Sequence, residues 1–401
     1  MNEINKLGDG AIRALSDTET RLIAIPPELE MPPLRSAARQ AVDVDFSLAI
    51  HNRTGKYFIG EELLSFADLP LGKTYYWWQA AERPLEGFYG RVMGRLQHWQ
   101  ILGKTVGGPL GWLPRRMPKR PLLHLDPFTV PTTVLRPIDA VLIHDLGPLT
   151  HPSLFPQDVC AIYRHIYDEI ARVGPHLVFV SHTSRKEFEA LYPGSNPHSS
   201  RIIHPPIRPG IGVGEATAVE GVEPPFLLTV GSVGSRKNQA RSIAAYARSG
   251  LAERGVRYVI CGGREPGYEE VEEIAKRTPG VHLLSYVSDA ELRWLYTQAS
   301  GFVLMSLLEG FGMPVGEAVR HRLIPLVSRG GVLREVAGEG ALEADPDDIM
   351  EIAARMAALV DMQADERRER LAKLEVTIER FDIAHFHKGW KGLFLDMLSA
   401  R

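Results

Sequence analysis

One segment in the second half of the chain places carboxylates beside glycines, a combination that can hold a hydroxylated or phosphorylated ligand. In GFVLMSLLEGFGMPVGEA (301–318), Glu309 precedes a glycine-containing turn and Glu317 follows eight residues after Glu309. The apolar run predicts a buried strand, and the Met-Pro pair after the turn predicts a helix start. Glycines admit a ligand close to the backbone, and helix N-termini attract anions. The segment suits a nucleotide-sugar; the alternative is a plain strand-to-helix turn with a solvated or arginine-paired Glu317.

A second segment adds two adjacent cations at another predicted helix start. FLLTVGSVGSRKNQ (226–239) is an apolar strand, a Gly/Ser loop, and then Arg236 and Lys237. Two cations at a helix N-terminus can neutralise a diphosphate leaving group. The alternative is a solvated basic pair on the surface. Gly231 and Gly234 do not fit the GxGxxG spacing of dinucleotide-binding proteins, which disfavours a dehydrogenase.

Alternating strands and helices must position both segments. In the second half, strands are expected at Phe226–Val230, Arg257–Cys261, Val281–Tyr286, Gly301–Ser306 and Leu323–Ser328, with helices at Asn238–Arg248 and Asp289–Gln298. In the first half, strands are expected at Asp45–Ile50, Ala140–His144, Leu177–Ser181 and Arg201–His204, with helices at Asp158–Val173 and Ser184–Leu191. Apolar strands that alternate with helices predict parallel sheets covered on both faces.

The chain divides at a stretch rich in proline and glycine. We expect an N-terminal extension at 1–44, a first Rossmann-like domain at 45–206, a linker at 207–225, a second Rossmann-like domain at 226–380, and a C-terminal helix at 381–401. The cleft between two such α/β domains is the default ligand site. The predicted fold class is therefore α/β, with two Rossmann-like domains facing across a cleft and helices at the C-terminal end.

Composition excludes several classes of protein. The 401 residues carry a formal net charge of −3, with 44% hydrophobic and 24% charged residues, which is typical of a globular protein and not of a disordered chain or a basic nucleic-acid coat. Cys160 and Cys261 are the two cysteines, so a disulfide framework or a zinc site is not expected. Without a signal peptide or an apolar run long enough to span a bilayer, a cytoplasmic location is expected.

Taken together, the motifs resemble those of the retaining nucleotide-sugar glycosyltransferases of family 4, which have the GT-B architecture. The segment 301–318 resembles the E-x7-E segment of that family, and 226–239 is similar to its phosphate-binding segment, in the same order along the chain. The segments 45–64 and VLIHDLGPLTHP (141–152) resemble its first strand and loop and its "HDL" segment. The resemblance covers roughly residues 45–360.

The resemblance implies a role for each matching residue. It implies catalytic roles for His144, Glu309, Arg236 and Lys237, and donor-binding roles for Gly55, Val287, Gly310, Phe311, Gly312 and Glu317. No cofactor and no metal are expected; the second domain would bind the donor, GDP-mannose in preference to a UDP-hexose. Transfer would retain the anomeric configuration and deliver a hexose, with mannose favoured, to a glycan or a polyprenyl-diphosphate-linked saccharide in cell-surface polysaccharide synthesis.

Two other functions remain open from the sequence. One is a non-enzymatic nucleotide-sugar-binding or scaffold subunit of a polysaccharide assembly complex, and the other is a sugar-nucleotide epimerase of GT-B type. The charged residues at 236, 237 and 309 argue against a degenerate site. The glutamate spacing beside the basic pair disfavours the epimerase.

A basic segment at 83–120 stands out from the nearly neutral chain. It holds eight Lys and Arg residues and one acidic residue, Glu86, a net charge of +7. We expect a patch that contacts an anionic membrane surface or the acceptor, made of Arg115, Arg116, Lys119, Arg120, Trp99 and Trp112. The enzyme would then sit peripherally on the inner membrane face. The alternatives are a solvated insertion whose tryptophans pack on the domain and, more weakly, RNA binding; no nucleic-acid partner is expected.

Overall fold

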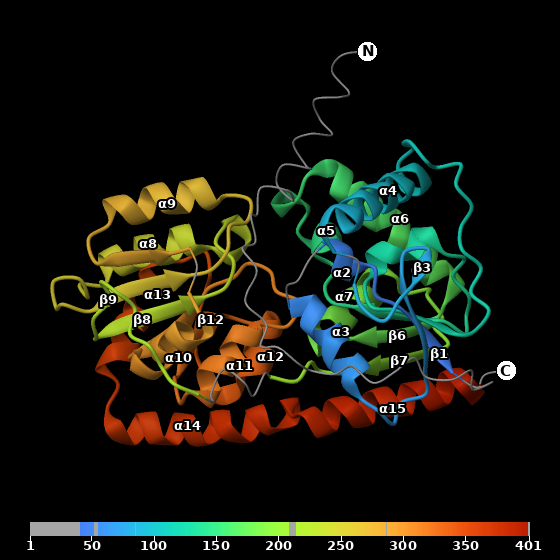
Figure 1. Ribbon diagram of the computed structural model, residues 1–401. Coiled ribbons are helices and arrows are strands. Elements are labelled where there is room, and N and C mark those ends of the chain that lie inside the picture. Colours follow the sequence, from blue (N-terminus) through green and yellow to red (C-terminus); the bar gives the residue numbers. More distant parts are fainter. Residues whose placement is uncertain (1–40, 52–54, 85, 208–213, 286, 400–401) are drawn as a thin grey trace, which may run out of the picture. The chain divides into compact units, whose positions relative to one another are not determined.

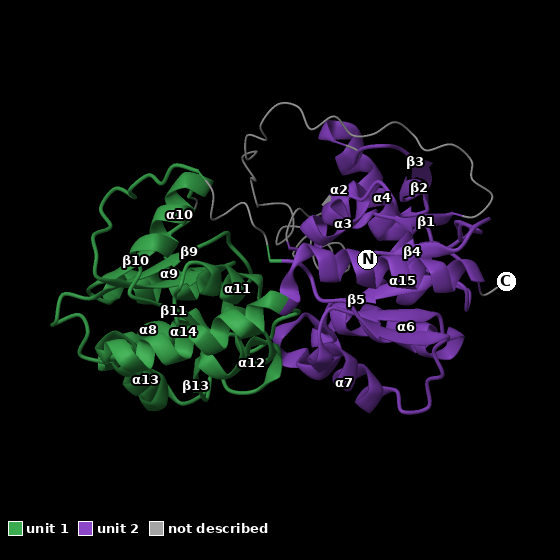
Figure 2. Cartoon of the chain, turned by 90° about the horizontal axis from the view of Figure 1, so that it is seen from below, with its two compact units in different colours: residues 1–29, 207–379 green, residues 30–206, 380–401 purple. Residues whose placement is uncertain are grey.

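The computed structural model describes residues 41–399 except 52–54, 85, 208–213 and 286. The predicted extension at 1–44 therefore lies almost wholly outside the described residues. The chain forms two compact units, one built on residues 207–379 and the other on residues up to 206 together with the C-terminal residues from 380 (Figure 2). We call them unit 1 and unit 2, and each has its own sheet.

Unit 1 contains a six-stranded parallel sheet in the order β10-β9-β8-β11-β12-β13 (Figure 1). Its strands are β8 (Phe226–Val230), β9 (Arg257–Cys261), β10 (Val281–Leu284), β11 (Gly301–Leu304), β12 (Pro325–Ser328) and β13 (Leu342–Ala344). Its helices are α8 (Gln239–Arg248), α9 (Tyr268–Arg277), α10 (Asp289–Gln298), α11 (Met313–Arg320), α12 (Gly331–Ala337), α13 (Ile349–Asp361) and α14 (Ala364–Ile378), with the 3₁₀ turns η4 (Ser235–Lys237) and η5 (Gly338–Gly340). The predicted strand–helix alternation of this half is confirmed.

The strand order of unit 1 fixes where a ligand would lie. From β8 the chain runs outward through β9 and β10, then crosses back to β11 on the other side of β8. The junction of β8 and β11 is thus the topological switch point, where loops at the carboxyl ends of the strands diverge and leave a crevice. The loops after β8 and β11 are the two segments that the sequence analysis singled out.

Unit 2 contains a seven-stranded sheet in the order β3-β2-β1-β4-β5-β6-β7. Its strands are β1 (Val42–Asp45), β2 (Leu71–Tyr76), β3 (Gln79–Ala80), β4 (Leu122–His124), β5 (Ala140–Ile143), β6 (His176–Phe179) and β7 (Ser199–Ile202). Its helices are α2 (Leu48–His51), α3 (Gly55–Ser65), α4 (Gly87–Thr105), α5 (Gly147–Thr150), α6 (Gln157–Val173), α7 (His182–Leu191) and α15 (Ile383–Ser399), with the 3₁₀ turns η1 (Pro127–Thr132), η2 (Pro152–Leu154) and η6 (Glu379–Phe381) at its boundary. Every strand pair is parallel except the β2–β3 hairpin.

The first strand was predicted at the wrong residues. Residues 45–50 were expected to be extended, but β1 ends at Asp45 and α2 begins at Leu48. The cause is the Asp45 carboxylate, which accepts hydrogen bonds from the Ser47 backbone N–H at 3.1 Å and from its hydroxyl at 2.6 Å. These local bonds turn the chain out of the sheet even though apolar residues follow.

The C-terminal helix α15 packs into unit 2. Phe386, Trp390, Leu393, Phe394 and Met397 along it are buried. At its first half, His387 and Lys391 hydrogen-bond Asp68 of the loop after α3 at 2.7 and 2.9 Å. The chain therefore returns to unit 2 after completing unit 1. Residues 214–225, the described part of the predicted linker, contain no helix or strand.

Candidate functional site

Lys237 and Glu309 form the centre of the site in unit 1. Lys237 ends η4 directly after the β8 loop, and its Nζ forms an ion pair with Glu309 Oε1. Only 8% of each side chain is exposed, so the pair is held out of bulk water. Ser306 donates a further hydrogen bond to Glu309 Oε1 at 2.8 Å. The loops after β8 and β11 are thereby joined at the switch point of the sheet.

The charges around Glu309 fix its protonation state. Burial by itself would raise the pKa of Glu309, but Lys237 and Arg236 outweigh it and hold the pKa below its ordinary value. Burial lowers the pKa of Lys237, against the opposing effect of Glu309. At neutral pH, Glu309 is therefore an anion that can accept hydrogen bonds from hydroxyl groups.

Arg236 is fixed by a residue that the sequence analysis missed. Glu265, in the loop after β9, accepts from Arg236 Nε at 3.1 Å and from Nη2 at 3.0 Å, a bidentate pair. Arg236 Nη1 donates to the Leu308 carbonyl at 3.1 Å and lies 3.8 Å from Glu309 Oε2. Ser232 also donates to Glu265. Nothing in the sequence marks Glu265, because it lies in a segment of ordinary loop composition and meets Arg236 only through the sheet.

The glycine turn leads into α11 as predicted. Gly312 has φ +91° as the residue before the helix, a conformation that disfavours L side chains, and an added Cβ would meet Leu333 Cδ2 at 2.6 Å. Gly310 is half-buried and Phe311 is buried with 5% exposure. The turn leads directly into the N-terminus of α11, and the positive end of a helix dipole suits an anionic ligand.

Glu317 and Val287 stand on other elements of the same unit. Glu317 lies inside α11, 2% exposed, and accepts a hydrogen bond from Tyr296 at 3.0 Å. Glu317 therefore contacts a buried phenol within unit 1. Val287 is half-buried in the loop between β10 and α10, one residue before the Ser288 cap of α10.

His144 directly follows β5 of unit 2, the strand that neighbours β4 in the sheet. It is 4% exposed, and its Nε2 pairs with the Leu125 carbonyl at 2.8 Å, which assigns the proton to Nε2 and leaves Nδ1 as the acceptor. Lys56 forms an ion pair with Asp126 at 2.9 Å. Burial, reinforced by Lys56, lowers the pKa of His144 to about 4, so the imidazole is neutral at physiological pH. Gly55, exposed at the start of α3, precedes Lys56.

The predicted basic patch is largely turned inward. Arg115 pairs with Glu169, Arg116 pairs with Asp45 at 3.0 Å, and Arg120 approaches Asp43 at 3.5 Å. These contacts neutralise the three arginines within unit 2. Of the other members of the patch, Lys119 is exposed, Trp99 is half-buried and Trp112 is 78% exposed. Segment 83–120 thus contains α4 and the connection to β4, and carboxylates of unit 2 compensate three of its eight basic side chains.

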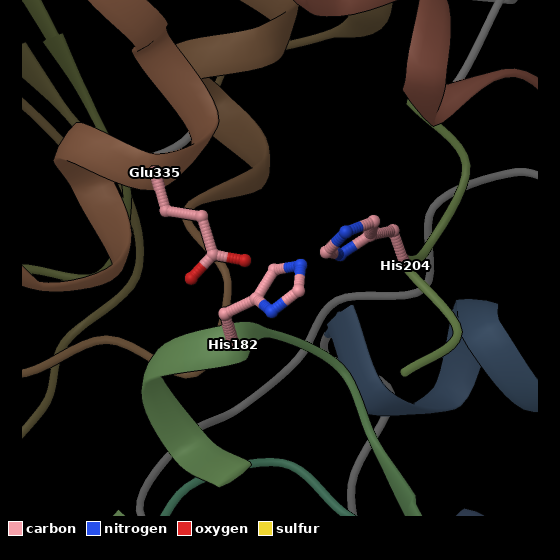
Figure 3. Close-up of side chains that lie close together, drawn as sticks. All are labelled: His182, His204 and Glu335. Atoms are coloured by element: carbon pink, nitrogen blue, oxygen red, sulfur yellow. The ribbon is translucent and has the colours of Figure 1, made fainter. Parts of the chain in front are cut away.

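Two histidines of unit 2 also lie close together. The rings of His182, the first residue of α7, and His204, which follows β7, have centroids 5.8 Å apart (Figure 3). His204 Nδ1 pairs with the Val180 carbonyl at 3.0 Å, and its ring meets Phe381 edge-on. Glu335, also drawn, belongs to α12 of unit 1. The two imidazoles supply two nitrogen donors, fewer than a zinc site requires.

The sequence of unit 1 matches a known protein family. Residues 216–374, nearly all of unit 1, match the family "Glycosyl transferases group 1". "O-antigen chain mannosyltransferase B" of Escherichia coli is 27% identical over 259 residues, which cover 62% of this chain and 67% of that protein. "O-antigen chain mannosyltransferase RfbU" of Salmonella typhimurium is 26% identical over 211 residues, 52% of this chain and 57% of that protein.

Solved structures agree on the fold. An alpha,alpha-trehalose-phosphate synthase (UDP-forming) from Burkholderia vietnamiensis superposes with a TM-score of 0.57 at 14% identity and covers 79% of each chain. Among the described residues, no helix has the length and apolar character needed to cross a bilayer. The predicted α/β fold class and the resemblance are confirmed, and the chain carries, in unit 1, a domain of the glycosyl transferases group 1 family within a GT-B fold.

Proposed function

We propose that the protein is an anomer-retaining, metal-independent hexosyltransferase. The donor is GDP-mannose in preference to a UDP-hexose, and the acceptor is a hydroxyl of a glycan or of a polyprenyl-diphosphate-linked saccharide in cell-surface polysaccharide synthesis. The names of the similar mannosyltransferases support the sugar. The observation that carries the proposal is the buried Lys237–Glu309 pair, with Arg236 beside it, at the β8/β11 switch point.

The residues of unit 1 can supply the electrostatics of this reaction. As the bond between the anomeric carbon and the diphosphate oxygen breaks, negative charge develops on the departing phosphate. Lys237, Arg236 and the positive end of the α11 dipole stabilise that charge, a role that a metal ion would otherwise fill. Glu309 accepts hydrogen bonds from sugar hydroxyls, and Glu317 exchanges its bond to Tyr296 for one from the ribose.

Retention requires the acceptor oxygen to form its new bond on the face from which the diphosphate leaves. In this scheme the acceptor hydroxyl gives its proton to the departing phosphate oxygen, so no enzymatic carboxylate is needed as base or nucleophile. Glu309 suits this division of roles because its ion pair with Lys237 makes it a weak base. His144 presents its unprotonated Nδ1 as an acceptor for a sugar hydroxyl.

The test is a comparison of Lys237→Met and Glu309→Gln with a matched control, Arg254→Gln. Arg254 forms an exposed ion pair with Asp361 in the same unit, remote from the loops described. Binding of GDP-mannose and of UDP-glucose is measured by calorimetry, and transfer is measured by GDP or UDP release, with and without EDTA. Each site variant should lower transfer by about 10²- to 10³-fold, whereas the control should match the wild type.

Several results would overturn the proposal. Unchanged donor affinity and turnover in both site variants would show that Lys237 and Glu309 do not act on the donor. Loss of turnover in EDTA would show that the reaction needs a metal ion. Donor binding without release of nucleotide in cell extracts that contain acceptor would favour a binding subunit. Conversion of the donor to its epimer in the absence of acceptor would favour an epimerase.

A further inference from the structure

Helix α4 of unit 2 buries an unusual set of residues. Its buried positions recur every three or four residues and form one stripe: Gly90, Gly94, Gln97, Gln100 and Ile101. This stripe packs on η1, α2 and α6. A helix at a protein surface ordinarily turns its large apolar side chains toward the core. In α4, glycine and glutamine occupy most of the buried positions. The Trp77 indole N–H donates a hydrogen bond to Gln100 Oε1 at 2.7 Å.

Three large apolar residues in the first half of α4 are exposed to solvent instead. Phe88 is 76% exposed, Tyr89 is 54% exposed and Val92 is 37% exposed. Phe88, Val92 and Arg95 follow one another at intervals of four and three residues, so they share the helix face opposite the buried stripe. A contiguous exposed aromatic face of this kind marks an interaction surface.

A strained turn extends this face. Tyr89 donates to Gln79 Oε1 at 3.1 Å, which brings the β2–β3 hairpin beside the start of α4. The turn of that hairpin is Trp77–Trp78, and Trp77 has φ +61°, a left-handed conformation that is costly for an aromatic residue. Trp77 is buried, whereas Trp78 is 40% exposed. The hairpin turn therefore places a third exposed aromatic residue, Trp78, in the segment that Tyr89 contacts.

The same helix carries uncompensated positive charge. Its sequence contains Arg91, Arg95 and Lys104 and no carboxylate. Arg91 and Arg95 are exposed, and within the part of the chain that the structure describes neither forms an ion pair. They differ in this from Arg115, Arg116 and Arg120, whose charges are neutralised. Exposed aromatic side chains interleaved with free arginines fit the boundary between anionic headgroups and acyl chains.

We propose that unit 2 docks on an anionic phospholipid surface through the outward face of α4 and the β2–β3 turn, with Trp78, Phe88, Tyr89 and Val92 entering the headgroup region and Arg91 and Arg95 pairing with lipid phosphates. The uncompensated arginines disfavour a second copy of this chain as the occupant, because a symmetric pairing would oppose like charges. This surface replaces the residues at 115–120 as the centre of lipid contact.

The experiment is co-sedimentation of the full-length protein with vesicles of phosphatidylglycerol and phosphatidylcholine in equal parts, and with vesicles of phosphatidylcholine alone. Two variants test the face: Arg91→Gln with Arg95→Gln, and Phe88→Ser with Val92→Ser. Their matched controls are Arg164→Gln with Arg248→Gln, which removes two exposed arginines on α6 and α8, and Leu395→Ser, which removes a 59% exposed apolar residue on α15. Circular dichroism and thermal unfolding check that every variant is folded.

We expect binding to the anionic vesicles that weakens with added salt. Removal of the two arginines should lower the partition coefficient by about 30-fold, since each basic residue near such a surface contributes about a factor of five. Removal of Phe88 and Val92 should lower it about 10-fold or more. Both controls should bind like the wild type.

Three results would overturn the proposal. The first is the absence of binding at low salt, and the second is unchanged binding of both face variants. The third is a dimer in sedimentation equilibrium that Phe88→Ser with Val92→Ser dissociates, because the face would then be a subunit interface. Lipid binding does not depend on the proposed transferase activity. Calorimetric binding of GDP-mannose to the same variants separates the two, because it should be unchanged when only docking is lost.

Discussion

At the scale of single residues, buried charge pairs decide what the site can do. Glu309 is an anion because Lys237 and Arg236 lie beside it, and Arg236 is directed by Glu265. A residue such as Glu265 acts through another side chain. It is a positioning residue, and its contribution depends on Arg236 being present.

That dependence can be measured in a double-mutant cycle. Glu265→Gln removes the carboxylate of the bidentate pair and frees Arg236 to move, so the rate of transfer should fall. The KM for the donor should rise, whereas the free energy of unfolding should change little. In the presence of Arg236→Gln, the same change should have little further effect. We expect a coupling of about 1–3 kcal/mol from steady-state kinetics. Strictly additive effects of the two substitutions would contradict the positioning role.

His144 should make the stability depend on pH. Burial lowers its pKa to about 4 in the folded chain, below the ordinary value of 6.5. Between these values the unfolded chain binds more protons, so this contribution to stability is present above pH 6.5 and is lost as the pH falls toward 4. His144→Gln should remove about 3 kcal/mol of that difference. Urea unfolding of both proteins across this range checks it, and parallel pH profiles would refute it.

At the scale of elements, the C-terminal helix α15 completes unit 2. α15 buries five large side chains and fastens to Asp68 through His387 and Lys391. The hydrogen bonds to Asp68 join residues more than 300 positions apart in sequence. No local pattern indicates which unit such a helix joins, because either sheet could accept its apolar face.

Trp390 tests this assignment. It is fully buried, and its indole Nε1 has no hydrogen-bond partner among the residues that the structure describes. Trp390→Ala should therefore lower the free energy of unfolding by about 3–5 kcal/mol, whereas Trp390→Phe should cost less than about 2 kcal/mol. Chemical denaturation monitored by circular dichroism measures both. Equal effects of the two substitutions would show that the indole N–H is satisfied.

At the scale of the whole molecule, the candidate functional residues are distributed over two units, each with its own sheet. Unit 1 carries the matched glycosyl transferases group 1 domain and the Arg236–Lys237–Glu309 cluster, whereas unit 2 carries His144 and the exposed face of α4. Each unit has its own hydrophobic core. A nucleotide that binds unit 1 should accordingly stabilise that unit in particular.

Hydrogen exchange can localise this effect. GDP at about 100 times its Kd should stabilise the unit that binds it by about 2.7 kcal/mol. Exchange should slow in the amides of β8 and β11 and in the loops that follow them, while amides of β5 and β6 in unit 2 should change little. UDP in place of GDP serves as the comparison for donor preference. Equal slowing in both sheets would show that the nucleotide is shared or that the units unfold together.

The strand–helix alternation could be predicted from the sequence, and so could the two loops of unit 1 and the glycine turn before α11. These follow from local rules: apolar runs, caps and glycine conformations depend on neighbours within a few residues. Ser288 with Glu291, for instance, forms the complete capping box that begins α10. The family resemblance rests on these same local segments.

Which charged side chains form pairs depends on the tertiary structure. In unit 2, Arg115, Arg116 and Arg120 pair with carboxylates, and in unit 1 Arg236 pairs with Glu265. The helix α15 packs into unit 2. In α4, Phe88 is exposed, whereas Gly90 and Gln97 are buried. Each of these depends on contacts between segments far apart in the chain. Whether a charge is neutralised or free, and whether an aromatic residue is core or surface, is fixed only when the sheet brings its neighbours to it.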